Sequence, residues 1–123
     1  MTPSSAKSVI PITDRTFDFS VRVIALCREL ARNPVNRILG TQLLKAGTSI
    51  GANVEEAQAA QSKADFVSKT AIALKESRET HYWLRLLAAT DPIFGQRLPG
   101  LIQEAREIRD ILGAINSKAR KKC

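Results

Sequence analysis

The sequence is poor in the residues that build metal sites, disulfide frameworks and aromatic binding surfaces. Its 123 residues include two cysteines and one histidine, and 5% are aromatic. Cys27 falls within an apolar helical pattern and Cys123 is the last residue, so we expect neither a disulfide framework nor a thiolate metal cage. The low aromatic content argues against base stacking as a means of binding single-stranded nucleic acid.

The sequence also lacks a long apolar run. No segment approaches the length of a membrane span, and the start, MTPSSAKSVIP, has one lysine and no continuous hydrophobic segment, so no secretory signal is expected. Apolar residues make up 44% and charged residues 25%, which is typical of a soluble globular protein. The length suits one domain. We therefore expect a cytoplasmic protein without a membrane partner.

Positive charge is in excess, and most of the excess lies at the end of the chain. The formal net charge is +7, and the last six residues, KARKKC, carry four positive charges and no acid, which leaves 7 − 4 = +3 for residues 1–117. The candidate contacts to RNA or DNA are Lys118, Arg120, Lys121 and Lys122. The alternative is that this tail only increases solubility.

Proline, glycine and capping residues divide the sequence into helical segments, and no segment alternates apolar and polar residues as a half-buried strand does. We expect an all-α fold with helices over residues 14–32, 34–60, 62–89 and 98–117. Thr13 or Asp14, Asn33 and Ser62 are the expected helix caps.

These helices define three parts of the chain. Residues 1–12 are expected to form a flexible segment, residues 13–117 the helical bundle, and residues 118–123 a basic tail. A loop containing Gly95 is expected between the last two helices.

Two of the predicted helices carry more apolar surface than a single bundle can cover. Apolar residues span roughly 220° of the first helix, and a second apolar stripe lies roughly 140° from the core stripe of the third. This surplus predicts a homo-oligomer. The interface candidates are Ile72, Trp83, Leu86, Phe19, Leu26 and Leu30. The alternative is that Trp83 packs beneath the N-terminal segment of its own chain.

Residues 47–51, GTSIG, match the G-x-S-x-G pattern of a hydrolase nucleophile. That pattern needs a strand before the serine, whereas a helical apolar stripe passes straight through it, so we do not expect Ser49 to be a nucleophile. Gly40, Gly47 and Gly51 share one side of this helix and predict a close approach of another helix; the alternative is that they soften or kink it.

Metal catalysis is not expected either. A carboxylate-bridged metal pair in a helical bundle uses Glu-x-x-His motifs, but Arg78 stands three residues before His81. Other charged residues fit surface pairs, such as Lys75 with Glu79, and Asn53 fits a buried hydrogen bond that fixes helix register. We expect no enzyme, no catalytic residue, no metal and no cofactor.

Residues 47–66, GTSIGANVEEAQAAQSKADF, and 72–87, IALKESRETHYWLRLL, resemble the four helix bundle protein family, which is related to 23S rRNA-intervening sequence proteins and S23 ribosomal proteins. The resemblance implies an up-down-up-down four-helix bundle that assembles into a ring, typically a pentamer, and an association with nucleic acid. It implies no catalytic residues. The signature positions are Ser49, Asn53, Glu55, Glu56, Lys75, Glu76, Glu79, Tyr82 and Trp83.

Two functions remain open from the sequence. The first is a homo-oligomer that binds nucleic acid or a ribonucleoprotein through its positive charge. The second is a protein-interaction scaffold or adaptor that binds no nucleic acid and holds a small ligand in the pore of its ring.

Overall fold

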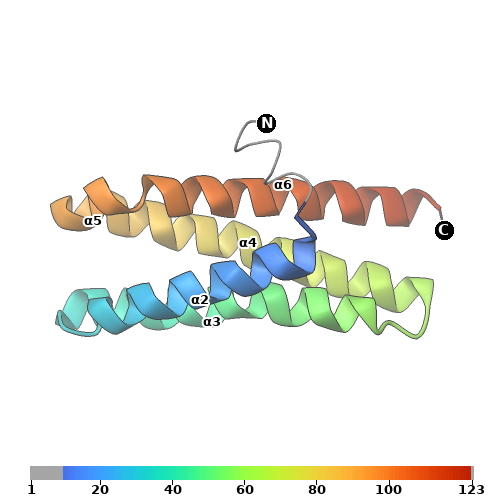
Figure 1. Cartoon of the computed structure of the whole chain (residues 1–123), viewed down its shortest axis with the longest axis horizontal. Coiled ribbons are helices and arrows are strands. Elements are labelled where there is room, and N and C mark those ends of the chain that lie inside the picture. The colour runs from blue at the N-terminus through green and yellow to red at the C-terminus, as the bar shows by residue number, and fades with distance from the viewer. Residues whose placement is uncertain (1–9, 123) are drawn as a thin grey trace.

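The structure is a computed structural model that describes residues 10–122. Over these residues every regular element is a helix. Four long helices lie side by side, and each runs opposite to the long helix before it (Figure 1). The helices are α2 (Ile12–Leu30), α3 (Pro34–Gln58), α4 (Lys63–Thr90), the short α5 (Pro92–Arg97) and α6 (Pro99–Lys121). Over the same residues, none of them has the length and apolar character needed to cross a membrane. The all-α prediction is confirmed.

Two predicted helix starts carry the expected side-chain caps. The side-chain oxygen of Asn33 accepts hydrogen bonds from the N–H groups of Val35 and Asn36, both at 3.0 Å. The Ser62 hydroxyl accepts one from the N–H of Asp65, also at 3.0 Å. These bonds satisfy N–H groups that have no partner inside the helix. The starts of α3 and α4 therefore follow from local chemistry alone.

The start of α2 differs from the prediction. The helix begins at Ile12, and its N-cap residue is Pro11, which makes no side-chain cap. The expected cap at Thr13 or Asp14 is therefore wrong. Both residues lie inside the first turn, where an acidic side chain such as that of Asp14 is favoured by the positive end of the helix dipole.

The segment around Gly95, predicted as a loop, forms the short helix α5. The Asp91 carboxylate caps it by accepting a hydrogen bond from the N–H of Ile93 at 3.0 Å, and Pro92 occupies the first helical position. Six residues are too few for a hydrophobic period to show in the sequence.

α6 continues to Lys121, past the predicted end at residue 117. Lys118, Arg120 and Lys121 are therefore helical and do not belong to a separate tail. Positive side chains are favoured in a last turn because they face the negative end of the helix dipole. Residues 1–9 and Cys123, which belong to the expected N-terminal segment and tail, lie outside the described residues.

One apolar core runs between the long helices. Its largest fully buried members include Val23, Leu43, Ile50, Val54, Leu84, Leu87, Ile108 and Leu112. Phe19, Leu26 and Leu30, predicted at a subunit interface, belong to this core, with 1%, 5% and 0% of their surface exposed. They are not available to a second copy, so this part of the interface prediction is wrong. The exposed half of the apolar arc of α2 holds Phe17 and Val21 instead.

α3 approaches α2 closely along its glycines. A Cβ atom added at Gly47 would lie 2.9 Å from Val23 Cγ1. One added at Gly51 would lie 3.3 Å from the backbone oxygen of Thr16, and one at Gly40 would be just as close to a leucine of α2. α3 is continuous through all three glycines, which let the two helices come this near because they have no side chain.

α2 is the shortest of the long helices, with 19 residues against 23 to 28 in the others. It begins beside the final turns of α3, where Thr13 and Glu55 line one groove, and α3, α4 and α6 extend beyond its start toward the end of the chain (Figure 1). One end of the domain is therefore built from three helices. We call it the three-helix end.

Candidate functional site

The start of α4 and the end of α6 meet at the three-helix end. The Lys63 ammonium donates a hydrogen bond to the backbone oxygen of Lys122 at 2.7 Å, which ties the two helix ends together. A cleft of about 400 Å³ opens beside this contact. Its lining residues are Lys63, Phe66, Ile115, Lys118, Ala119 and Lys122. Three lysines therefore surround an apolar cleft, which we call the lysine cleft.

A second cleft, of about 520 Å³, lies against α6 and is lined in part by Leu74 and Arg78 of α4. Its other lining residues are Gly113, Asn116, Ser117, Arg120 and Lys121. Together the two clefts gather six exposed cations from two helices. This group, which we call the basic end, consists of Lys63, Arg78, Lys118, Arg120, Lys121 and Lys122.

A buried asparagine fixes α6 against α4 within the basic end. The Asn116 amide donates hydrogen bonds to the backbone oxygen of Val67 at 3.0 Å and to the Thr70 hydroxyl at 2.9 Å. Asn116 and Thr70 are both buried, and a hydrogen bond in such low-dielectric surroundings is strong. These bonds set the rotation of the last turns of α6, and so the directions in which Lys118 and Arg120 project.

Four of the six cations were predicted from the sequence, whereas Lys63 and Arg78 were not. Each is separated along the chain from the basic residues near residue 120, so no charge run marks it. For Lys63 the available signal was topological: when consecutive long helices are antiparallel, the start of one lies beside the end of the next. Arg78 lies in the middle part of α4 and had no such signal.

The second apolar stripe of α4 is partly covered by the chain itself. Ile72 is 38% exposed, whereas Trp83 and Leu86 are half-buried. The Trp83 indole donates a hydrogen bond to the Glu79 carboxylate at 3.2 Å, and its ring meets that of Tyr82 edge-on with 5.2 Å between the ring centroids. Side chains of its own helix therefore position Trp83, and Ile72 is the most accessible member of the stripe.

The signature residues of α3 make contacts within that helix. The Asn53 amide donates to the backbone oxygen of Ser49 at 2.8 Å and to its hydroxyl at 3.2 Å. Asn53 therefore does not make the predicted buried bond that fixes helix register. Glu55 and Glu56, one turn further on, are exposed.

The signature residues of α4 form a partly buried acidic pair on one side of the helix. Burial raises the pKa of Glu76, and the neighbouring Glu79 carboxylate adds to the effect. Glu79 bonds the Trp83 indole, and among the described residues it makes no ion pair with Lys75, so the predicted Lys75 to Glu79 pair is wrong. Lys75 and Tyr82 are exposed.

Ser49 lies in the middle of α3, so its G-x-S-x-G pattern forms no strand-to-helix turn. His81 is buried on α4, and its Nε2 atom has no hydrogen-bond partner among the described residues. Burial lowers the pKa of His81, and the nearby Arg85 adds to the effect. Within residues 10–122, no three His, Cys, Asp or Glu side chains are grouped as metal ligands.

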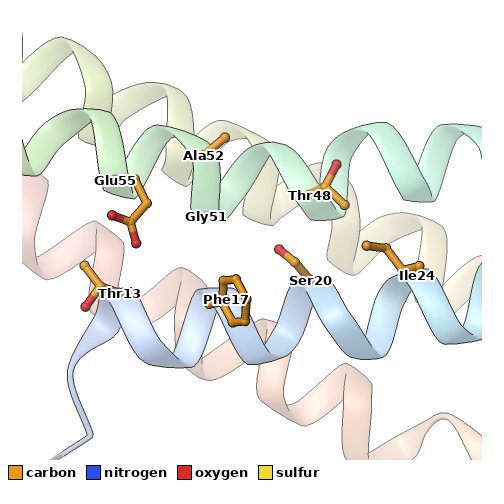
Figure 2. A pocket seen from close by; sticks show the side chains of 8 residues that line it. All are labelled: Thr13, Phe17, Ser20, Ile24, Thr48, Gly51, Ala52 and Glu55. Carbon is orange, nitrogen blue, oxygen red and sulfur yellow. The ribbon is translucent and has the colours of Figure 1, made fainter.

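An apolar groove of about 270 Å³ lies between α2 and α3, and of its lining residues only Gly51 and Glu55 were singled out from the sequence. Figure 2 shows Phe17 and Ile24 on α2 facing Thr48 and Glu55 on α3, with Gly51 leaving the space between them open. Phe17 is 65% exposed, although it is one of the most apolar side chains in the chain. The groove is a second candidate surface for a partner.

Comparison with known proteins places the chain in a family. Residues 10–114 match the family model described as 23S rRNA-intervening sequence protein. The chain is similar to a crystal structure from Bacteroides thetaiotaomicron, described as a protein of unknown function from the S23 ribosomal protein family, with a TM-score of 0.81 and 40% sequence identity over 86% of this chain and 98% of that one. No curated protein matches the chain. Because the family model spans most of the sequence, the chain belongs to the 23S rRNA-intervening sequence protein family.

Proposed function

We propose that this chain is a non-enzymatic, cytoplasmic four-helix-bundle protein that forms a homo-oligomeric ring of five copies and binds nucleic acid or a ribonucleoprotein through its basic end. The observation that carries the nucleic-acid part is the gathering of six exposed cations from α4 and α6 around two clefts. Two helices, separated in sequence, contribute positive side chains to the two clefts. Such side chains attract the phosphate backbone.

We expect this binding to show little preference for nucleotide sequence and to weaken steeply as the salt concentration rises. Lysine and arginine contacts to phosphates position a nucleic acid without reading its bases. If all six cations contact phosphates of duplex DNA, log K falls by about 5 per log unit of salt, from about 0.9 for each contact.

Reversing the four basic residues of α6 tests the nucleic-acid part. The test variant carries Lys118→Glu, Arg120→Glu, Lys121→Glu and Lys122→Glu. A control variant with the same net charge reverses four exposed arginines elsewhere, Arg22, Arg28, Arg32 and Arg37. We expect fluorescence anisotropy at low salt to show affinity for RNA and DNA retained in the control and lost in the test variant. Equal loss in both would contradict a localised site.

The oligomer part rests on apolar surface that a single chain leaves uncovered. Ile72 on α4 is 38% exposed beside the half-buried Trp83 and Leu86, and the family resemblance supplies the ring and its subunit number. Solution mass measurement checks both. Ile72→Glu is expected to give smaller species, whereas Ile93→Glu, at a residue on α5 that is 66% exposed, is expected to leave the mass unchanged. A monomeric wild type contradicts the proposal directly.

The groove between α2 and α3 favours a second candidate function, a protein-interaction scaffold without nucleic-acid binding and with a small ligand in the pore of the ring. Exposed Phe17 and Val21 lie along α2, and Phe17 lines the groove. This candidate is preferred if wild type binds no RNA or DNA at low salt. A change in assembly mass on Phe17→Ser would then assign the groove to contacts between copies.

A further inference from the structure

We propose that the lysine cleft binds single-stranded nucleic acid, with one unpaired base against the Phe66 ring and the flanking phosphates at Lys63, Lys118 and Lys122. This inference rests on the proposed function, which requires only that the basic end attract phosphate. It adds which form of nucleic acid is preferred and which side chain makes the preference. It also revises the expectation, drawn from the low aromatic content, that base stacking plays no part.

The composition of the cleft points to a ligand with both an apolar and an anionic part. The three lysines are exposed, whereas Phe66, Ile115 and Ala119 supply apolar lining. A site for phosphate alone would need no apolar lining. A nucleotide offers a flat base for the apolar lining and a phosphate on each side for the cations.

The cleft is open because α2 stops short of it. α2 stops short of this end of the domain, so no fourth helix covers α4 and α6 there (Figure 1). Phe66 and Ile115 are half-buried, whereas the core residues Phe19 and Ile108 are 1% and 0% exposed. The volume of about 400 Å³ lies within the range of about 300–1,000 Å³ typical of small-molecule sites.

One lysine of the cleft is held in place before any ligand binds. The Lys63 ammonium donates one hydrogen bond to the backbone oxygen of Lys122, and an ammonium has three N–H groups. Two therefore stay available for phosphate oxygens. Fixing the side chain in advance reduces the entropy that a ligand contact must overcome.

The aromatic lining favours a single strand over a duplex. In a duplex each base is stacked between its neighbours, so its face cannot reach a protein ring, whereas an unpaired base can stack on an aromatic side chain. Lysines alone would bind either form according to its charge density. A preference for single strands, if present, must therefore depend on Phe66.

The experiment compares conservative variants at Phe66. Fluorescence anisotropy at low salt would measure the binding of a 12-nucleotide oligouridine, an oligothymidine of the same length, and a 12-base-pair duplex. Phe66→Leu keeps an apolar side chain but removes the ring, and we expect it to weaken binding of both single strands about tenfold while changing duplex binding less than twofold. Phe66→Tyr keeps the ring and is expected to retain single-strand affinity. Circular dichroism would verify that both variants fold.

Each other outcome has a defined meaning. If Phe66→Leu binds single strands as tightly as wild type, while Lys118→Glu weakens all three probes, the inference fails and the proposed function stands. If wild type binds none of the three probes, the proposed function fails with it. Sedimentation with phosphatidylserine vesicles provides a further arm: vesicle binding that depends on Phe66, without oligonucleotide binding, would overturn the inference in favour of an anionic lipid.

Discussion

The guanidinium of Arg15 and the carboxylate of Glu104 form a buried two-point ion pair that joins α2 to α6. The Nε atom lies 3.1 Å from Glu104 Oε2, and the Nη2 atom lies 2.8 Å from Glu104 Oε1. Nη2 also contacts the Glu107 carboxylate at 3.0 Å. The hydrogen bond to Glu104 is the main cause of the raised pKa of Arg15.

Removing one member of this pair should destabilise the protein strongly. We expect Arg15→Leu to lower the free energy of unfolding by about 3 kcal/mol, because it removes the two hydrogen bonds and the positive charge that Arg15 supplies to the buried Glu104 carboxylate. The double variant Arg15→Leu with Glu104→Leu should recover most of the loss. Urea denaturation measures both. Arg97→Leu, which breaks an exposed pair with Glu29, is the control and should shift the midpoint far less.

Adding one methyl group to α3 should have the opposite effect from adding one to α6. A Cβ at Gly47 would lie 2.9 Å from Val23 Cγ1 in the buried core, so we expect Gly47→Ala to cost about 1–3 kcal/mol. A Cβ at Gly113 would lie 3.9 Å from Leu74 Cδ1, an ordinary contact, so Gly113→Ala should stabilise by up to about 1 kcal/mol through helix propensity. Thermal unfolding of the two variants checks the signs; a stabilised Gly47→Ala would contradict the close approach.

Acidification should weaken the fold through His81. Burial, followed by Arg85, Arg109 and Arg106, lowers its pKa in the folded protein below the ordinary 6.5, although Asp110 opposes the effect. The folded state therefore favours the neutral ring, and its stability is complete above pH 6.5 and falls as pH drops below 6.5, where the unfolded chain binds the proton first.

By pH 5.5 the loss from His81 is at most about 1.4 kcal/mol. Urea midpoints at pH 7.5 and 5.5 measure it, and His81→Gln should show a smaller difference between the two conditions than wild type. An identical difference in the two proteins would mean that other groups set the pH dependence.

The Cys27 thiol should resist modification in the folded protein. Burial raises its pKa to about 11, and its sulfur lies 3.4 Å from the backbone oxygen of Gly40. At pH 8 we expect a thiol reagent to label it about two orders of magnitude more slowly than in urea, because the thiolate is the reactive form. The measurement uses a Cys123→Ser background so that one thiol is followed. Equal rates with and without urea would show that Cys27 is accessible.

The positions of the long helices could be predicted because each has local causes. Asn33 and Ser62 cap their own helices, and apolar residues recur at helical spacing between such signals. The six residues of α5 contain no full period, so the same reasoning read Asp91, Pro92 and Gly95 as a loop. Local patterns identify long helices and miss short ones.

The site was less predictable because it depends on which helices become neighbours. Periodicity predicted the width of the apolar arc of α2 but not which part of the arc the neighbouring helices cover. Phe19 was therefore predicted at a subunit interface, whereas it is buried in the core. Lys63 stands 59 residues from Lys122, and only the packing of α4 against α6 brings them together. The lysine cleft was not predicted, because the residue pattern does not show that α2 ends before reaching Phe66.

The short α2 also divides the domain into halves of different rigidity. Amide protons of α6 where α2 packs on it are expected to exchange with solvent only when the two helices separate, whereas those of the last turn of α6 need only that turn to fray. α6 would then be rigid where it packs against α2 and more flexible near the cations of its last turns. A ligand in the lysine cleft could then be bound through small movements of the last turns of α6, while the rest of the domain keeps its conformation.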